Sequence, residues 1–529
     1  MIELKSLFVI VSCLLSGTIA FAQSNLSLVP FPKEVVVKAG GVDMAKGVHI
    51  DVPQSVEQLV QTGLRDRLGW KITKSGIPLK MMLAVGDNDH PESYKIRVNT
   101  SGIYIEAPQE AGLIYGLQTF LQLGIQYTDR LPILEIKDEP RFSWRAYMLD
   151  EGRYFQGKEA VLKLLDEMAL LKMNVFHWHL TDDAGWRIEI KKYPLLTKVG
   201  SKRDSSQINV NGKKWESKIY DGRVHAGYYT QEEIKEIVAY AKARNITIVP
   251  EINMPGHASA AVASYPWLGT SKEKIKVPTK FGVVTTVFDV SDPKVIQFLH
   301  EVLEEVAGLF PGEVIHIGGD EVKYDQWKES ASINAYMGAN NLADFSDLQV
   351  FFTNNISNFI EKSLNRRTMG WNEIMGLRTH AYQNTKNATT QLSKNAIIHF
   401  WRGTTKDFDT ALARGYQIVN SNHAETYIDY TYKEIGLSKA YQFDPVPDGL
   451  DSIKQKNIIG LGCQMWGEWT PSFNEVTYQT FPRIAAYAET AWSPPQTKDY
   501  NRFKKNLLPL FQHWKQKGYH IPDKSEWGL

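Results

Sequence analysis

The sequence His316-Ile317-Gly318-Gly319-Asp320-Glu321 places two carboxyl groups, those of Asp320 and Glu321, directly after a short apolar run. Residues 314–317 have the length and character of a buried strand, and the two glycines let the chain turn tightly where that strand ends. Ionisation of one carboxyl group in a partly buried cleft raises the pKa of its neighbour, so one can serve as an acid while the other stays charged. The stretch therefore predicts acid–base chemistry, although an isolated Asp-Glu pair is ordinarily just two solvated acids before a helix.

Similar apolar runs recur between amphipathic helical segments from residue 144 onward. Residues 161–171 and 295–306 carry apolar side chains at the i, i+3, i+4, i+7 spacing of a helix. Strands and helices that alternate over roughly 350 residues predict an α/β fold of the (β/α)8 TIM-barrel type, with the active site at the carboxyl ends of the strands. The eight runs are 144–149, 173–179, 246–252, 314–317, 368–371, 396–401, 416–420 and 458–466.

The residues ahead of the barrel follow another pattern, in which short alternating runs accompany two helical segments. Titratable residues do not gather there, so a small α+β domain with a structural role is predicted. The polar turn Asp138-Glu139-Pro140 marks its boundary. The predicted division is a signal peptide at 1–22, the α+β domain at 23–138, the barrel at 139–495, and a helical tail packing on the barrel at 496–529.

The first 22 residues have the pattern of a secretory signal peptide. Lys5 precedes an apolar segment at 7–19, and Ala20-Phe21-Ala22 is a cleavage signal of small residues. Residues 10–13 resemble a bacterial lipoprotein box, but cleavage after Ala22 is preferred because the apolar run continues past Cys13. Export to the periplasm or the exterior is expected. Cleavage would leave Cys463 as the only cysteine, so stability is expected from core packing rather than from a disulfide.

The composition favours a soluble globular protein. The 529 residues are 43% hydrophobic and 22% charged, and 60 Lys and Arg against 59 Asp and Glu give a net charge of +1. This balance argues against nucleic acid or a charged membrane surface as a partner. No later stretch has the ~18 apolar residues of a membrane span.

Polar and aromatic residues follow all eight predicted strands. Each has an ordinary explanation alone, since a strand-end aromatic is usually core and an arginine is usually paired. Together they suit a neutral polyhydroxylated ring, because charged groups bind hydroxyls and indole faces cover C–H surface. The set comprises Arg153 after the first run, Asp182 and Asp183 after the second, Asn253 and His257 after the third, Asp320 and Glu321 after the fourth, then Trp371, Trp401, Tyr427, Asp429, Trp466 and Glu468.

Four strings in this set closely resemble family 20 glycoside hydrolases, the exo-acting β-N-acetylhexosaminidases. The resemblance spans nearly the whole mature chain, since that family also carries a small α+β domain ahead of its barrel. It implies hydrolysis of terminal β-linked N-acetylglucosamine or N-acetylgalactosamine in a glycan, with no cofactor and no metal. The strings are His-Trp-His-Leu-Thr-Asp-Asp-x-Gly-Trp-Arg at 177–187, Pro-Glu-Ile-Asn-Met-Pro-Gly-His at 250–257, the 316–321 stretch, and Trp-Gly-Glu at 466–468.

The resemblance also implies roles for individual residues. Glu321 would be the general acid, and Asp320 would orient the substrate's own 2-acetamido group, whose carbonyl oxygen attacks C1. Tyr427 would hydrogen-bond that carbonyl. The remaining roles fall to Trp371, Trp401 and Trp466 around the acetamido methyl, to Arg153, Asp429 and Glu468 at the sugar hydroxyls, and to His257 with Asp182 or Asp183 in a relay to Glu321.

The sequence departs from the family pattern at two positions. Asn253 stands where the family usually has Asp, and Tyr154 where His is common. Because an amide offers no negative charge to His257, the tuning of the relay is left open, as is the choice between Asp182 and Asp183.

Two other interpretations compete with this one. A metal-dependent hydrolase is suggested by His177, His179, His257 and His316, although the first two lie where interior barrel layers are expected. A sugar-binding protein without activity is the second, against which the intact Asp320-Glu321 pair argues. The gluco or galacto preference and the oligomeric state, a homodimer included, remain open.

Overall fold

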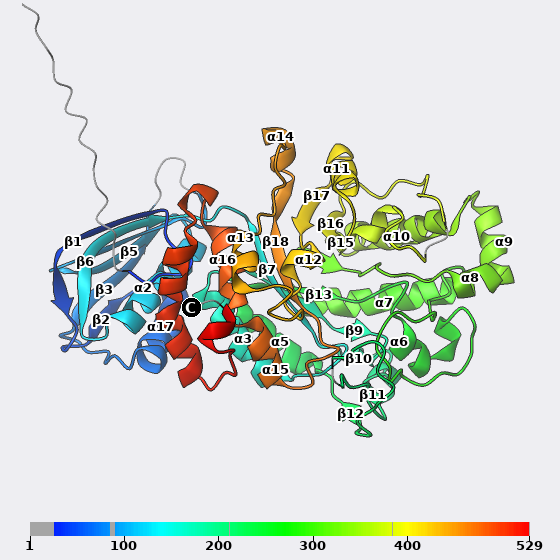
Figure 1. Cartoon of the computed structure of the whole chain (residues 1–529), viewed down its shortest axis with the longest axis horizontal. Helices are drawn as coiled ribbons and strands as arrows, with labels where there is room; N and C mark the ends of the chain where they lie inside the picture. Colours follow the sequence, from blue (N-terminus) through cyan, green and yellow to red (C-terminus); the bar gives the residue numbers. More distant parts are fainter. Residues whose placement is uncertain (1–25, 85–89, 211, 383–384, 528–529) are drawn as a thin grey trace, which may run out of the picture.

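The computed structural model describes residues 26–84, 90–210, 212–382 and 385–527, so the predicted signal peptide lies outside the described residues. A six-stranded sheet with its helices forms one part, and a closed barrel of eight parallel strands forms the other (Figure 1). The fold predicted from the sequence, a (β/α)8 barrel preceded by a small α+β domain, is confirmed. No helix within the described residues is long and apolar enough to cross a lipid bilayer.

The N-terminal sheet has the strand order β1-β6-β4-β5-β3-β2, and helix α2 packs on one face (Figure 1). Nearly all of α2 is buried, as expected for a helix between a sheet and a second domain. The elements are β1 Glu34–Asp43, β2 Val48–Asp51, α1 Gln54–Thr62, a π-helical turn at Gly63–Arg67, β3 Ile77–Leu83, β4 Tyr94–Asn99, β5 Gly102–Ala107, α2 Glu110–Gln126 and β6 Arg130–Asp138.

Strands β3 and β6 were not predicted individually from the sequence. Each contains a proline, Pro78 or Pro132, which removes a backbone donor and weakens the strand signal. Pro132 pairs with Gly41, where a bulge in β1 shifts the register. The proline therefore lies where the hydrogen-bond ladder is already interrupted.

All eight strands of the barrel coincide with the predicted apolar runs to within about two residues. Their parallel pairing is continuous around the barrel, from β7 through β8 to β18 and back to β7. The strands are β7 Trp144–Asp150, β8 Val175–His179, β13 Thr247–Glu251, β14 Val314–His316, β15 Arg367–Trp371, β16 Ile397–Phe400, β17 Gln417–Asn420 and β18 Ile458–Met465.

Amphipathic helices surround the barrel and bury the positions that the sequence periodicity indicated. In α3, for example, Val161, Leu164 and Met168 are buried. The longer helices are α3 Lys158–Leu170, α5 Gln231–Lys242, α7 Pro293–Leu309, α9 Ala331–Ala339, α10 Phe345–Lys362, α11 Thr405–Ala413, α15 Phe473–Thr480 and α16 Arg483–Trp492. Short elements include β9 Thr181–Asp182, β10 Gly185–Trp186, β11 Lys202–Arg203, β12 His225–Ala226, α6 Ser259–Ser264, α8 Asp325–Glu329, α12 His423–Thr426, α13 Leu437–Gln442 and α14 Ser452–Gln455.

The C-terminal helix α17 (Tyr500–Gln516) contacts both parts of the molecule (Figure 1). Asn506 donates a hydrogen bond to the Leu28 carbonyl in the N-terminal domain, and the Trp514 indole donates to Glu167 of α3. The tail thus packs on the barrel and on the smaller domain together.

Candidate active site

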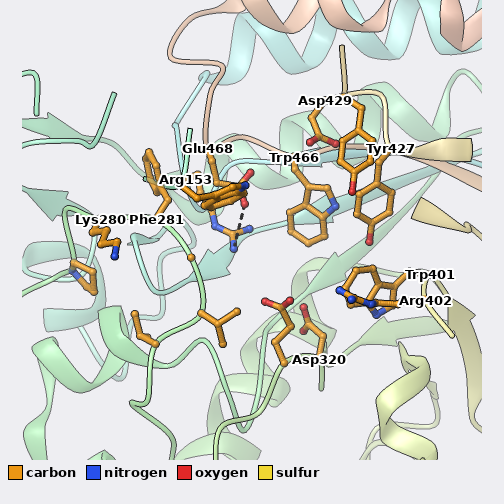
Figure 2. A pocket seen from close by; sticks show the side chains of 17 residues that line it. Arg153, Lys280, Phe281, Asp320, Trp401, Arg402, Tyr427, Asp429, Trp466 and Glu468 are labelled. Carbon is orange, nitrogen blue, oxygen red and sulfur yellow. Dashed lines mark ion pairs between the residues drawn. The ribbon is translucent and has the colours of Figure 1, made fainter. Parts of the chain in front are cut away.

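A pocket of about 610 Å³ opens at the carboxyl ends of the barrel strands, where the sequence predicted the site. Figure 2 shows Asp320 between Trp401 on one side and Arg153 with Glu468 on the other. Its lining includes Arg153, Asp320, Glu321, Trp401, Tyr427, Asp429, Trp466 and Glu468, all predicted, together with Trp215, Pro278, Lys280, Phe281, Gly282, Val283, Val284, Arg402 and Tyr430.

The backbone after β14 is shaped to present the two carboxyl groups. Gly318 and Gly319 have positive φ, and a Cβ atom on Gly318 would lie 2.0 Å from Asn253 Oδ1. Only glycine fits there. Glu321 itself has φ +51°, and His257 has φ +48°. Non-glycine residues in this left-handed region store backbone strain, which is concentrated at functional sites.

Asp320 is anchored, whereas Glu321 is not. The Asn253 amide donates a hydrogen bond of 3.1 Å to Asp320 Oδ1, and Asn253 Oδ1 accepts one of 3.3 Å from the Gly319 backbone. Glu321 makes no hydrogen bond with a described residue, and His257 Nε2 lies 3.7 Å from its Oε2. The amide at position 253 therefore serves Asp320 rather than His257, because an amide, unlike a carboxylate, can donate.

Burial raises the pKa of both carboxyl groups. The pKa of Glu321 rises to about 7, because burial is reinforced by the negative charge of Asp320 and only partly offset by His257. Burial also raises the pKa of Asp320, and the charge of His257 opposes that rise. A carboxyl group with a pKa near 7 holds its proton in a fraction of molecules at neutral pH, as a general acid requires.

The structure distinguishes Asp182 from Asp183. His257 Nδ1 lies 2.8 Å from Asp183 Oδ2, which completes a chain from Asp183 through His257 to the carboxyl groups of Asp320 and Glu321. Asp182 instead pairs with Arg153 Nε at 2.9 Å. Burial lowers the pKa of His257, but the surrounding carboxylates outweigh it and raise that pKa well above its usual value. Asp182, Asp183 and His257 were all predicted, but none of them lines the pocket itself.

Arg153, Asp429 and Glu468 form the polar wall of the pocket. Arg153 is buried and contacts Asp150 at 3.1 Å and Glu468 at 3.7 Å, the latter drawn in Figure 2. Asp429 Oδ1 and the indole nitrogen of Trp466 are buried without a hydrogen-bond partner among the described residues. Buried polar atoms are ordinarily satisfied, so these two fit the hydroxyl groups of a bound ligand.

Four aromatic residues pack as one cluster beneath and beside Asp320 and Glu321: Trp371, Trp401, Tyr427 and Trp466. Tyr427 stacks parallel to Trp401, with ring centroids 5.9 Å apart. Trp371 differs from the others, because it is 1% exposed and lies outside the pocket lining. It stacks on His399 at 4.1 Å and donates its indole N–H to Glu251 Oε1 at 2.9 Å. Its ring thus supports the other three from the barrel interior.

Two clusters have the composition of a metal site. The nitrogen atoms of His177, His316 and His399 lie within 4.8 Å of one another in the barrel interior, and Asp182, Asp183 and His257 do so beside the pocket. In the first, His177 hydrogen-bonds Glu251 at 2.8 Å and His316 hydrogen-bonds His399 at 3.3 Å. In the second, the charges are already paired with Arg153 and with each other. That activity needs no metal stays a prediction.

The sequence analysis missed several residues that act on the site. Glu373 accepts hydrogen bonds from the Trp401 indole at 2.9 Å and from His380 at 2.8 Å, and its charge helps to raise the pKa of Glu321. The position of Glu373, two residues after the strand-end Trp371, was the only sequence feature that could have indicated its role. Glu251 was quoted in a motif but given no role. Trp215, Lys280 and Arg402 line the pocket from loops without a distinctive pattern.

A parallel (β/α)8 barrel with two carboxyl groups in an indole-lined pocket fits a glycoside hydrolase. Two family models match the chain: glycosyl hydrolase family 20, catalytic domain, at residues 142–495, and glycosyl hydrolase family 20, domain 2, at residues 25–139. The chain belongs to glycosyl hydrolase family 20, and the prediction from the sequence motifs is confirmed.

Named relatives agree with this assignment. A beta-hexosaminidase of Porphyromonas gingivalis is 35% identical over 82% of this chain, but the match spans only 55% of that protein. The Flavobacterium johnsoniae chitobiase structure superimposes with a TM-score of 0.79 at 33% identity, covering 94% of this chain and 74% of the other. The family 20 exo beta-N-acetylglucosaminidase of Vibrio harveyi, solved in complex with N-acetylglucosamine, gives 0.80 at 28% identity, covering 94% and 79%.

Proposed function

We propose that the chain is an exo-acting β-N-acetylhexosaminidase that releases terminal β-linked N-acetylglucosamine or N-acetylgalactosamine from glycans. The observation that carries this proposal is the pairing of an anchored Asp320 with a protonatable Glu321 beside an aromatic cluster. The relatives named beta-hexosaminidase and exo beta-N-acetylglucosaminidase support the same substrate class.

The proposed mechanism takes its nucleophile from the substrate. Glu321 gives its proton to the glycosidic oxygen as the C1–O bond breaks, and the acetamido carbonyl oxygen bonds to C1 from the opposite face. The resulting oxazolinium ion carries a positive charge, which Asp320 stabilises. Water activated by the Glu321 carboxylate then attacks C1 and reopens the ring. Two inversions leave the product with the β configuration.

The positions of the other carboxylates support this route. A protein nucleophile or general base would face Glu321 across the sugar at a separation of about 5 to 9.5 Å. Asp320 is its chain neighbour and lies on the same segment. Asp182 is paired with Arg153, Asp183 with His257, and Glu373 with His380 and the Trp401 indole. Among these three groups none is free to attack C1, and the other two carboxylates of the pocket lining, Asp429 and Glu468, are assigned to the sugar hydroxyls.

Binding of the terminal sugar is assigned to the polar wall and the aromatic cluster. Asp429 and Glu468 accept hydrogen bonds from hydroxyl groups, and Arg153 donates. Tyr427 donates to the acetamido carbonyl, while Trp401 and Trp466 cover the acetamido methyl, with Trp371 supporting them from below. A plain glucoside would leave this apolar surface without a partner.

The test uses purified enzyme and four measurements. Turnover of a chromogenic β-N-acetylglucosaminide, equal with and without EDTA, establishes a metal-independent hexosaminidase. NMR is expected to detect the β anomer first, the 2-hydroxy analogue to be inert, and a thiazoline mimic of the cyclic intermediate to inhibit. Holding the reacting group within the substrate is worth up to about 7 to 11 kcal/mol, so the analogue should lose far more than one hydrogen bond provides. Activity that zinc restores after EDTA, an α first product, or equal turnover of the glucoside would contradict the proposal.

We also propose that the mature chain is exported to the periplasm or the exterior. The leader pattern at residues 1–22 supports this. Sequencing the N-terminus of the mature protein tests it, and a mature chain that begins at Gln23 is expected. A homodimer stays a prediction, which light scattering addresses directly.

A further inference from the structure

The charged residues that line the pocket differ between its depth and its mouth. In the depth, Arg153 is paired with carboxylates, and the acidic groups of Asp320 and Glu468 are buried. At the mouth, the two lining residues with exposed charges are Lys280 and Arg402, and both are positive. Figure 2 shows them on opposite sides of Asp320.

Neither mouth cation is neutralised by a residue that the structure describes. Lys280 and Arg402 form no ion pair with any residue of the ranges that the structure describes. The charge of Arg402 instead lies 5.7 Å from the ring centroid of Trp401, in cation–π contact, which positions its guanidinium over the pocket edge. Most exposed surface cations are simply solvated. Two of them facing one binding cavity from separate loops provide a site for a negative charge.

An exposed aromatic face lies at the same mouth. Trp215 lines the pocket with 51% of its surface exposed, and it packs edge-on against Trp469 at 5.3 Å between ring centroids. Trp469 in turn packs against Phe281, the neighbour of Lys280. These contacts hold the Trp215 ring in place, and a fixed, exposed indole is a stacking platform for a sugar.

The mouth is the side where the departing sugar must lie. The terminal sugar occupies the depth, where Arg153, Asp429 and Glu468 bind its hydroxyls. Its glycosidic oxygen has to reach Glu321, so the rest of the substrate extends outward past the half-exposed segment 278–284. A negative group on that next sugar then comes within reach of Lys280 or Arg402.

We propose that the mouth of this pocket is a subsite for an anionic sugar, in which Trp215 stacks on the departing residue while the positive charges of Lys280 and Arg402 attract its carboxylate or sulfate. The inference rests on the proposed hexosaminidase activity and specifies its substrate class. Arg402 suits either group, because its planar guanidinium donates two parallel hydrogen bonds to a carboxylate or a sulfate. Lys280 adds a point charge on the opposite side.

The test compares disaccharides that differ only in charge. N-acetylglucosaminyl-β-1,4-glucuronic acid is set against N-acetylglucosaminyl-β-1,4-glucose, and N-acetylglucosaminyl-β-1,3-galactose against its 6-sulfate on galactose. Each exposed cation is expected to favour the anionic member about two- to fivefold in kcat/KM, so about four- to twenty-five-fold together. The preference should shrink in 0.5 M NaCl, since salt screens exposed charges. A response in only one pair identifies the carboxylate or the sulfate as the group that is bound.

Matched variants separate this site from a general effect of surface charge. The double variant Lys280→Gln/Arg402→Gln should remove the preference while leaving turnover of the neutral disaccharides unchanged. Lys394→Gln/Lys456→Gln removes the same charge from the opposite end of the barrel, because both residues precede their strands, and should keep the preference. Trp215→Ala should raise KM for all four disaccharides and not for the methyl glycoside, which lacks a departing sugar.

The outcomes also separate this inference from the proposed function. Equal kcat/KM within both pairs, or a preference that survives Lys280→Gln/Arg402→Gln, overturns the anionic subsite while leaving the hexosaminidase intact. Failure to cleave the methyl glycoside and every disaccharide overturns the proposed function itself. If the KM values of Trp215→Ala for the disaccharides were unchanged, Trp215 would not stack on the departing sugar.

Discussion

Two buried polar clusters in this molecule are built in opposite ways. At the junction of the two domains, Lys172 contacts Asp138 at 2.9 Å and Tyr94 at 2.7 Å, and the Trp492 indole also donates to Asp138 at 2.9 Å. In the pocket, Asp429 Oδ1 and Trp466 Nε1 have no described partner, and Glu321 makes no hydrogen bond with one. The polar groups of the junction all have partners in the protein and hold the two domains together. Those three groups of the pocket lack partners among the described residues and can bind a ligand.

The difference appears in the charges as well. The junction cluster, meaning Tyr94, Asp138, Lys172 and Trp492, contains one cation and one carboxylate in direct contact. The pocket instead places Asp320 and Glu321 side by side, so burial and mutual repulsion raise the pKa of Glu321 to about 7. Buried opposite charges compensate each other, so that removing one leaves the other uncompensated, while neighbouring like charges separate the pKa values of two carboxyl groups.

The largest effect is expected from Glu321→Gln, which removes the unpaired acid. General acid catalysis contributes about 10²- to 10⁴-fold, so kcat/KM should fall by that factor on substrates with poor leaving groups. Dinitrophenolate departs without a proton, so turnover of a dinitrophenyl glycoside should escape most of this loss. Equal losses on both substrates would show that Glu321 has another role. The thermal midpoint should be unchanged, in contrast to variants of the junction.

Asp320→Asn is expected to lower kcat on good and poor leaving groups alike. A neutral amide cannot stabilise the positive oxazolinium ring, and loss of one such electrostatic contact costs about 10²- to 10³-fold. Steady-state kinetics on the same two substrates check this. If only the poor leaving group were affected, the charge of Asp320 would be acting through Glu321 rather than on the intermediate.

Lys172→Met tests the junction cluster. It leaves Asp138 buried without its cation, and breaking a buried pair in this way costs about 3 to 5 kcal/mol of unfolding free energy. Calorimetry should record a lower melting temperature, while kcat/KM of the folded enzyme at 25 °C stays unchanged. Lys172→Met/Asp138→Asn is the matched control and should be less destabilised. Normal stability with reduced activity would refute the separation of the two clusters.

The smallest effect is expected from Asp183→Asn, which removes the carboxylate nearest His257. With less negative charge around it, His257 holds its proton less tightly, and its positive charge then lowers the pKa of Glu321 less. Glu321 has to be protonated to act, so its higher pKa should move the alkaline limb of the kcat/KM profile upward by up to about one pH unit. A limb that stays in place or moves downward would mean that His257 does not tune Glu321.

The sequence predicted the secondary-structure elements better than the contacts between side chains. The eight barrel strands follow from short apolar runs, and Asp320 and Glu321 from their place at the end of one run, because strand periodicity and glycine requirements are local. The same local signal did not predict β3 and β6, because each strand contains a proline, Pro78 or Pro132, which is unusual in a strand. Asp138, taken from the sequence as part of a polar turn, is 4% exposed and anchors the junction.

By itself, the sequence determined the family and the barrel, and it placed Asp320 and Glu321 together at a strand end, since these depend on residue types in a fixed order along the chain. Only the tertiary structure decided that Asp183 rather than Asp182 meets His257, that Asn253 holds Asp320, and that Trp371 supports the pocket from below. It also brought Trp215, Lys280 and Arg402 to one mouth. These contacts join loops far apart in sequence, and their geometry is set by how the strands and helices pack rather than by any pattern within one segment.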